Sequence, residues 1–497
     1  MHANFTKDFK GVLVSKVRKS ILLSFGQNYV SFILQFFSSI ILSRLLTPAQ
    51  IGIFSVAAVL IGFAHTLRDF GSTTYVIQEK ELTPEKIRSA FAMTIISAWF
   101  MAALIGLGSG YAATFYHEPG IRSVMLVLSI NFFLIPFGSI PMAYMQRQMD
   151  FYHVALVNTL SNLTSTIATI GLAYFGFSYL SMAWGSVVGV VSTIVMMQIW
   201  RPAGLPFFPG LKEIRNVFSF GMLSNVIMIL LDISKGGPDL IIGRLSNMVA
   251  VGYFGRAVAL VSMFEKFVMK TLWNVALPHF SSQSGDRNAI RESFLHSMVY
   301  VTALAWPFFA SLGIMAYPIV ILLYGKQWEP VASLLKLLCL SSFLTSPFLF
   351  LGSIMTAIGQ MKQNVNFLFI HVLILGLLVG VAAPRGLIAL GEAFVVINLV
   401  DAVIYILQCR VILAVGFWEI ARALRQSAGV AIASATPLMI MHFFAKGFFH
   451  DQLWLQLLLD VICGFSGWVC GVFLFKHPLK NEIANLLLMA KQARKAF

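Results

Sequence analysis

Fourteen long apolar segments divide this sequence and constrain its fold more than any other feature. Each is long enough to cross a hydrocarbon core of about 30 Å as a helix. Inside a bilayer a helix hydrogen-bonds all of its own backbone groups, so apolar runs of this length favour helices. The sequence therefore predicts an all-α integral membrane protein with about 14 transmembrane helices. The expected spans are 20–43, 49–70, 89–116, 120–144, 151–175, 177–200, 215–244, 248–275, 296–324, 331–358, 362–383, 386–410, 426–446 and 452–475.

Composition agrees with a membrane protein and excludes several classes of function. Hydrophobic residues make up 58% of the chain and charged residues 11%, against about 25% charged residues in a soluble domain. The connections between spans are too short for a soluble catalytic domain, and no G-x-x-x-x-G-K-[ST] phosphate-binding loop is present. The four cysteines form neither a C-x-x-C pair nor a Cys/His cluster of the kind that binds metal. We therefore expect a transporter rather than an enzyme, with no cofactor and no metal.

The distribution of basic residues predicts the topology. The net charge of +15 could suggest nucleic acid as a partner, but 23 Lys and Arg residues fall in alternate connections and at both ends, whereas only six fall in the other connections. This asymmetry is the positive-inside signal and places both termini in the cytoplasm. Residues 1–19 lack the features of a signal peptide and carry apolar side chains on one helical face, so we expect an amphipathic segment at the inner interface.

Two segments of the chain repeat each other at an offset of 200 residues. Residues 40–60 align without a gap to residues 240–260, with seven identities that include Arg44/Arg244 and Gly52/Gly252. Six spans separate the copies, so both halves enter the membrane in the same sense. Parallel repeats of this kind are typical of secondary transporters, which bind substrate between the repeats. The expected parts are an amphipathic segment 1–19, a six-helix lobe 20–200, a cytoplasmic linker 201–214, a second six-helix lobe 215–410, an extra helix pair 411–475 and a basic cytoplasmic tail 476–497.

Four stretches of the sequence resemble one family of transporters. They are LSRLLTPAQIGIFSVAAVLIGFAHTLRDFGSTTYVIQ (42–78), PMAYMQRQMDFYHVALVN (141–158), PDLIIGRLSNMVAVGYFGRAVAL (238–260) and VALPHFSSQSGDR (275–287). The chain resembles the polysaccharide exporters, or Wzx-type flippases of lipid-linked oligosaccharides, and in particular their colanic-acid-exporter branch. Their superfamily also holds multidrug exporters and lipid II flippases. Ser246-Asn247 and the charged segment 235–238 depart from the family pattern.

Basic residues inside the spans are the first candidates for a substrate site. A charge at the bilayer centre costs about 2.5–3.5 kcal/mol on insertion scales, so such residues usually face a water-filled cavity or a partner. A long side chain near a helix end can instead snorkel to the interface, and we interpret Lys336 in this way. The basic residues inside or at the edge of spans are Arg68, Lys235, Arg256, Lys266, Lys270 and Lys336.

Arg256 and Lys235 are the strongest candidates for binding an anionic substrate. Both lie about 14 Å from the hairpin that joins their spans, at 1.5 Å per residue, which is close to the membrane centre. The first-half counterpart of Arg256 is Val56, so the second half alone carries this charge. The alternative is that the two cations pair internally with Asp232 or Asp239.

The Gly236-Gly237-Pro238 segment predicts a bend or a break in the seventh span. A continuous helix through this span would be about 48 Å long, which exceeds the thickness of the hydrocarbon core. Backbone groups freed at a break need water or protein as partners, so broken helices at this depth line cavities. Asp232, Lys235 and Asp239 would then face a wet cavity. The alternative is a plain kink with a local Asp/Lys pair.

Three further side chains, Arg68, Lys270 and Glu265, complete the candidate site. Arg68 lies at the inner end of the second span, where its planar guanidinium could meet a lipid pyrophosphate, or it could form a surface pair with Asp69. Lys270 on the eighth span is either a substrate cation or a snorkelling residue. Glu265, like Asp232, is a candidate for coupling transport to H⁺ or Na⁺. The remaining intramembrane carboxylates are Glu392, Asp401 and Asp460, and we interpret His371 as a neutral core residue.

The resemblance and the intramembrane charges together predict a flippase of the bacterial cytoplasmic membrane. The resemblance implies that the substrate is an undecaprenyl-pyrophosphate-linked oligosaccharide for surface or exopolysaccharide biosynthesis, moved by alternating access among membrane lipids. It also implies a polysaccharide polymerase and a chain-length regulator as partners. One alternative is a cation-coupled drug or metabolite exporter, whose cavity would be acidic for cationic drugs. A membrane glycosyltransferase or polysaccharide polymerase is disfavoured because the outer loops are short.

Overall fold

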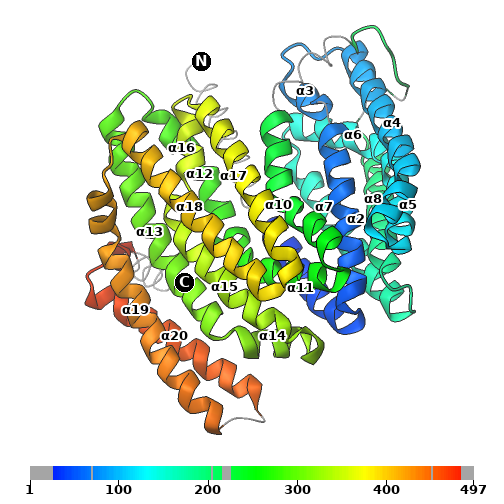
Figure 1. Cartoon of the computed structure of the whole chain (residues 1–497). Coiled ribbons are helices and arrows are strands. Elements are labelled where there is room, and N and C mark those ends of the chain that lie inside the picture. The colour runs from blue at the N-terminus through cyan, green and yellow to red at the C-terminus, as the bar shows by residue number, and fades with distance from the viewer. Residues whose placement is uncertain are drawn as a thin grey trace, which may run out of the picture. The chain divides into compact units, whose positions relative to one another are not determined.

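The computed structural model describes residues 26–68, 71–202, 205–206, 208–214, 225–448 and 452–482. Within these ranges the chain forms helices joined by short turns and contains no strand (Figure 1). Nine described helices are long and apolar enough to cross a membrane, or ten if the bent pair of helices at residues 119–147 is one span. The prediction of an all-α membrane protein is therefore confirmed. The count of 14 spans stays a prediction, and the expected amphipathic segment 1–19 lies outside the described residues.

Contacts between residues divide the chain into two units, Met1–Gly252 and Tyr253–Phe497. The first unit contains a helix at residues 26–45, α2 (Pro48–Arg68), α3 (Ser72–Gln78), α4 (Pro84–Tyr116), α5 (Pro119–Leu134), α6 (Pro136–Arg147), α7 (Phe151–Tyr174), α8 (Leu180–Ile199), α10 (Asn225–Leu245) and the start of α11 (Met248–Val261). In this unit α10 packs against α2. The boundary between the two units lies after α10, between Gly252 and Tyr253 of α11. This division by contacts differs from the lobes expected from the repeat, which stay a prediction.

The second unit continues from α11 to the last described residues. It contains a π-helical segment η1 (Glu265–Met269), α12 (Lys270–Ser282), α13 (Arg287–Ile314), α14 (Ala316–Tyr324), η2 (Lys326–Trp328), α15 (Pro330–Thr345), η3 (Ser346–Phe348), α16 (Leu351–Ala357), α17 (Met361–Ala382), η4 (Ala383–Arg385), α18 (Leu387–Leu413), α19 (Phe417–Phe448) and α20 (Leu453–Leu474). Within it, α19 and α20 form an antiparallel pair, and α13 packs against both α15 and α19.

Proline and capping residues set where several helices begin. Thr83 accepts a hydrogen bond from the backbone N–H of Lys86 and precedes Pro84 at the start of α4. Asp286 accepts from the N–H groups of Asn288 and Ala289 at the start of α13. Such caps satisfy backbone donors that have no partner inside the helix, so polar residues at these positions fix the helix boundaries.

The expected break in the seventh span is absent, because α10 continues through Gly236-Gly237-Pro238 without interruption. The glycines instead allow α10 to approach α2 closely. A Cβ atom on Gly236 would lie 2.6 Å from Cγ1 of Val59, and one on Gly243 would lie 2.9 Å from Cγ2 of Val56. These small residues therefore serve helix packing, as is common between membrane helices. A bend of 51° does occur elsewhere, between α5 and α6 at Pro136.

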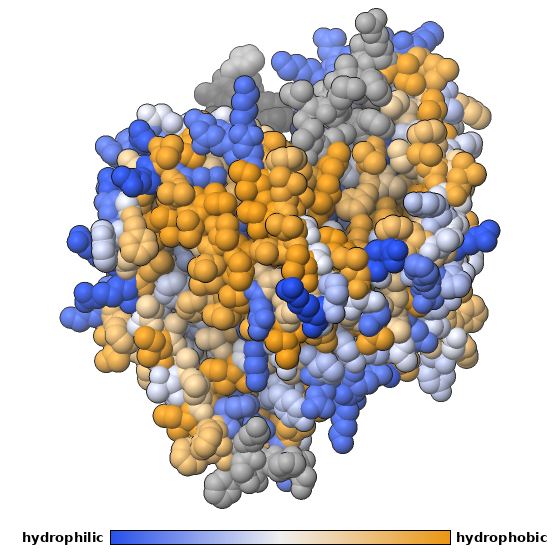
Figure 2. Space-filling view, viewed as in Figure 1, coloured by the Kyte–Doolittle hydropathy of each residue, from blue (hydrophilic) through white to orange (hydrophobic). Residues whose placement is uncertain are grey.

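Large apolar side chains remain exposed on the surface of the second unit. On α17 and α18, Leu377 is 67% exposed and Val411 is 70% exposed. Figure 2 shows apolar side chains gathered over these two helices on the visible face. A soluble monomer rarely exposes contiguous apolar patches of this kind, whereas a bilayer covers them with lipid. The exposed apolar surface therefore agrees with a multi-pass membrane protein.

Candidate functional site

The C-terminal end of α2 places His65 and Arg68 against one aromatic ring. The imidazole of His65 stacks on the ring of Phe132 from α5, with centroids 4.3 Å apart and planes 25° apart. The guanidinium carbon of Arg68 lies 5.9 Å from the centroid of the same ring. The face of an aromatic ring attracts a cation without neutralising it, so Phe132 helps to position Arg68. Asp69, the alternative partner of Arg68, lies outside the described residues.

A hydrogen bond joins this end of α2 to α10. The Thr66 hydroxyl donates to Oδ2 of Asp232, and both side chains are half-buried. The sequence separation of 166 residues means that only the fold brings them together. Arg68 and Asp232 therefore lie on neighbouring, hydrogen-bonded helices, and the structure brings two of the predicted site residues into one region of the first unit.

The three charged residues of α10 form one stripe. Because α10 is continuous, Asp232, Lys235 and Asp239 are spaced by three and four residues and fall on the same helical face. Lys235 is exposed, and the two aspartates are half-buried. A cation with carboxylates one turn before and one turn after it can bind an anion, or exchange partners with the carboxylates, at low cost. The stripe thus replaces the wet break that we expected as the reason for these charges.

Arg256 of α11 lies beside two aromatic rings of the second unit. Its guanidinium carbon is 5.6 Å from the ring centroid of Tyr324 and 5.6 Å from that of Trp328. Trp328 is fully buried, and the Tyr253 hydroxyl donates to the carbonyl of Gln327 at 3.2 Å, which fixes this turn against α11. Cation–π contacts help to hold an arginine in place. The geometry therefore places a fixed cation on α11 beside the turn that carries Trp328.

Glu265 and Lys270 lie at the two ends of the π-helical segment η1. Glu265 is its first residue, Lys270 follows its last residue, and both side chains are exposed. Single π turns inside α-helices occur frequently at functional sites, because the extra residue widens the helix and re-aims nearby side chains. The sequence shows no signal for this segment. It places a carboxylate and a cation on the same span as Arg256, one turn apart.

The second unit contains two Asp–His pairs that were not assigned to the site from the sequence. The Nδ1 atom of His371 on α17 lies 2.8 Å from Oδ2 of Asp401 on α18, and Nδ1 of His442 on α19 lies 2.8 Å from Oδ2 of Asp460 on α20. Both aspartates are buried. All four residues stand out in the sequence as polar groups inside spans, but their pairing depends on how each helix pair packs. His371 is therefore a hydrogen-bonded partner of a carboxylate rather than an isolated core residue.

The described residues offer cations for an anion more readily than ligands for a metal. No cluster of three or more His, Cys, Asp or Glu side chains that could hold a metal ion occurs among them. The predicted site residues are divided between the two units, with Arg68, Asp232, Lys235 and Asp239 on α2 and α10 in the first unit, and Arg256, Glu265 and Lys270 spread along α11, η1 and the start of α12 in the second. In each unit an arginine lies beside an aromatic ring.

Comparisons with known proteins identify the family of this chain. A family model described as polysaccharide biosynthesis protein matches residues 41–333. The lipopolysaccharide biosynthesis protein WzxC of Escherichia coli (strain K12) is 23% identical over 375 residues, which cover 73% of this chain and 75% of that protein. The succinoglycan biosynthesis transport protein ExoT of Rhizobium meliloti (strain 1021) is 24% identical over 402 residues, covering 79% and 78%.

The fold is also similar to that of a solved flippase. The lipid II flippase MurJ, in an inward closed conformation, superposes with a TM-score of 0.75 at 15% sequence identity, covering 92% of this chain and 99% of that chain. At this identity the likeness shows a shared fold. It spans nearly the whole of both chains.

Proposed function

Because the chain belongs to the polysaccharide biosynthesis protein family, we propose that it is a flippase for undecaprenyl-pyrophosphate-linked oligosaccharide repeat units. The proposed site of action is the bacterial cytoplasmic membrane, with both termini in the cytoplasm. The repeat unit would enter from the inner leaflet and leave on the outer side by alternating access. The names of two relatives, in lipopolysaccharide biosynthesis and in succinoglycan transport, support this class of substrate.

The observation that carries the proposal is the setting of Arg256. Its guanidinium belongs to α11, whose other residues carry no charge, and it lies beside the rings of Tyr324 and Trp328. A fixed arginine donates two parallel hydrogen bonds to phosphate, which a pyrophosphate-linked lipid carries at the junction of its tail and its sugar. Arg68 repeats this setting on α2 with Phe132. Cations at such positions favour an anionic substrate over the cationic drugs of an exporter.

The remaining site residues receive roles consistent with this chemistry. Lys235 and Lys270 add positive charge for the pyrophosphate or for acidic sugars, and Asp239 accepts hydrogen bonds from sugar hydroxyls. Asp232 and Glu265 are the proposed carboxylates for coupling to H⁺ or Na⁺. The undecaprenyl tail stays among the membrane lipids while the head group crosses. A polysaccharide polymerase and a chain-length regulator are the proposed partners on the outer side.

A genetic experiment tests this function. In a producing strain that lacks the gene, lipid-linked repeat units should accumulate on the cytoplasmic face, and surface polysaccharide should be lost. The wild-type gene should restore both, whereas the Arg256→Ala variant should restore neither. An exporter would instead show normal polysaccharide together with increased sensitivity to cationic drugs, and that result would contradict the proposal.

A further inference from the structure

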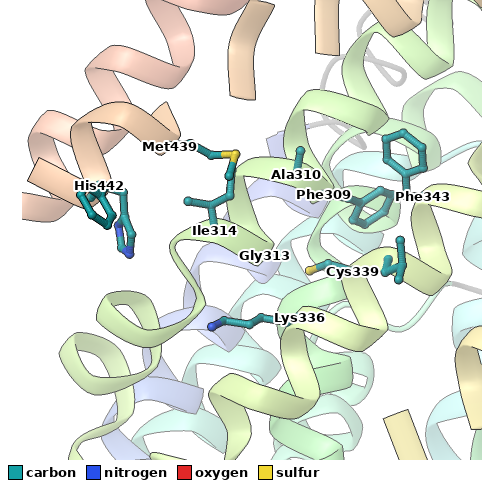
Figure 3. A pocket seen from close by; sticks show the side chains of 11 residues that line it. Phe309, Ala310, Gly313, Ile314, Lys336, Cys339, Phe343, Met439 and His442 are labelled. Atoms are coloured by element: carbon teal, nitrogen blue, oxygen red, sulfur yellow. The ribbon is translucent and has the colours of Figure 1, made fainter. Parts of the chain in front are cut away.

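A groove on the second unit combines apolar walls with a lysine and a histidine side chain. It lies among α13, α15 and α19 and has a volume of about 720 Å³. Its walls include Phe309, Ile314, Leu340 and Phe343. Figure 3 shows Lys336 entering from α15 and His442 from α19. A volume of this size is within the range of small-molecule sites, which is about 300–1,000 Å³.

The charge of the groove has one sign. Lys336 is exposed, and the lining contains no carboxylate. His442 binds the fully buried Asp460 through Nδ1 at 2.8 Å, which leaves its Nε2 atom for a ligand. An imidazole whose Nδ1 donates to a carboxylate can donate to an anion through Nε2 only when both nitrogens carry protons, so an anion bound there would bring a proton with it. The groove therefore complements a single anionic group.

Lys336 and His442 lie close to the ends of their helices, where the phosphates of membrane lipids are found. Lys336 is six residues from the start of α15 and His442 is six residues from the end of α19, so each is about 9 Å from that end of its helix. With 32 residues, α19 is about 48 Å long and exceeds a hydrocarbon core of about 30 Å by about 9 Å at each end if it is centred. His442 thus lies near the boundary between the hydrocarbon and the head groups, and Lys336 lies at the same distance from the end of its own helix.

We propose that this groove binds the phosphate of an anionic glycerophospholipid, such as phosphatidylglycerol, with one acyl chain along its apolar wall. Lys336 and the Nε2–H of His442 hold the phosphodiester, and Phe309 and Phe343 contact the chain. A soluble anion would gain nothing from the apolar wall, and a zwitterionic lipid would bring its own ammonium group against Lys336. Snorkelling alone explains a lone lysine at this depth, but it does not explain a histidine backed by a buried carboxylate.

Native mass spectrometry of the full-length protein in detergent tests the site. The probes are palmitoyl-oleoyl phosphatidylglycerol and phosphatidylethanolamine with the same chains, each titrated separately. The wild-type protein should retain one phosphatidylglycerol more tightly than phosphatidylethanolamine. Lys336→Gln should weaken this retention about tenfold, since it removes one charge-assisted contact. His442→Gln should weaken it similarly, and Lys326→Gln is the matched control because Lys326 is exposed in the same unit but does not line the groove.

A second variant separates binding from folding. Gly313 lines the groove, and a Cβ atom there would meet Cys339 at an ordinary 3.5 Å, so Gly313→Leu fills the groove from a tolerated position. It should abolish phosphatidylglycerol retention with an unchanged unfolding temperature. Equal retention of the two lipids by wild type, or unchanged retention in Lys336→Gln and Gly313→Leu, would overturn the proposal. Displacement of phosphatidylglycerol by equimolar undecaprenyl phosphate would also overturn it, because the groove would then belong to the polyprenyl substrate.

Discussion

Gly52 and Gly252, which occupy equivalent positions in the two copies of the repeat, each pack against the backbone of the other copy. A Cβ atom on Gly52 would lie 1.8 Å from the carbonyl oxygen of Met248, and one on Gly252 would lie 2.1 Å from that of Pro48. Pro48 and Met248 are themselves equivalent, as the first residues of α2 and α11. The contact is therefore reciprocal, as expected at a local twofold axis. The repeat seen in the sequence is thus present as a packed pair of helix starts.

This contact predicts a strong effect of the smallest substitution. Gly52→Ala should destabilise the protein by about 3 kcal/mol, the upper end of the usual cost of overpacking, because the obstructing atoms are backbone and cannot rotate away. Gly252→Ala should act similarly. The unfolding temperature in detergent measures the effect. Gly62→Ala is the matched control on α2, since a Cβ atom there meets nothing within 4 Å, and it should be neutral or stabilising. Equal unfolding temperatures for Gly52→Ala and Gly62→Ala would contradict the close approach.

The aromatic setting of Arg256 predicts graded effects on transport. Losing a charge-assisted contact to phosphate costs about 1.5–3 kcal/mol, so Arg256→Ala should reduce transport about ten- to a hundredfold. Arg256→Lys should retain partial activity, because the charge survives while the planar fork is lost. Rates of lipid-linked oligosaccharide translocation in vesicles measure both. If Arg256→Ala instead abolishes expression and a second change at Asp232 or Asp239 restores it, the arginine is a structural partner of a carboxylate.

The hydrogen bond from Thr66 to Asp232 predicts an energetic coupling between α2 and α10. Thr66→Val keeps the shape and removes the donor, and Asp232→Asn removes the charge of the acceptor. A hydrogen bond to a charged group contributes about 1.5–3 kcal/mol, and part of this should appear as coupling in a double-mutant cycle of unfolding free energies. Purely additive effects of the two substitutions would show that the bond contributes nothing to stability.

The buried His477 predicts a loss of stability in acid. Burial lowers the pKa of His477 below its ordinary value of 6.5. Its Nδ1 accepts the Leu479 N–H at 3.2 Å, and its Nε2 lies 3.2 Å from the Ser427 hydroxyl, which donates to the carbonyl of Val299 at 3.1 Å. A depressed pKa means that the folded state binds fewer protons than the unfolded state. The contribution of His477 to stability is therefore complete above pH 6.5 and decreases as the pH falls through its folded pKa.

Unfolding temperatures between pH 5 and pH 8 test this effect, with the range chosen to span about one to two units on either side of the ordinary histidine pKa. The wild-type protein should lose stability as the pH decreases below 6.5, its ordinary value. His477→Gln should flatten that dependence, whereas the exposed His279, replaced in the same way, should leave it unchanged. Parallel curves for the wild type and His477→Gln would show that His477 does not report on the folding of this region.

The predicted topology has its own direct test. Cysteines placed at Glu118 and Gly285, in a background with Cys463 and Cys470 replaced by serine, should be labelled by impermeant reagents from outside and inside respectively. Position 118 lies in a connection that is predicted to be outside the cell, and position 285 lies in one that is predicted to be in the cytoplasm. Labelling in the reverse sense would contradict the positive-inside assignment and place both termini outside.

The helical membrane fold was predictable from sequence because apolar length and charge placement follow directly from the physics of the bilayer. The repeat was visible because Arg44/Arg244 and Gly52/Gly252 keep their spacing. The break expected at Gly236-Gly237-Pro238 is absent, since α10 is continuous there, whereas the expected bend stays a prediction. Glycine also permits close helix packing, and only the position of Val59 reveals that role.

The contacts that define the candidate site were harder to predict than the residues. Thr66 and Asp232 are 166 residues apart, and His442 and Asp460 are 18 residues apart on different helices. The sequence of an apolar span does not show which of its faces contacts a neighbouring helix, since nearly any apolar face can pack against another. Polar residues inside spans were therefore visible as candidates, while their partners depended on helix packing.

Translocation by the purified protein in vesicles is the most direct measurement of the proposed function. Fluorescent undecaprenyl-pyrophosphate-linked oligosaccharide is placed in vesicles that contain the protein, and an impermeant quencher reports the fraction in the outer leaflet. With the wild-type protein, lipid should move between the leaflets until the quencher reaches nearly all of it, and Arg256→Ala should slow this about ten- to a hundredfold. If wild-type and protein-free vesicles instead leave the same protected fraction, the chain does not flip lipid-linked oligosaccharide.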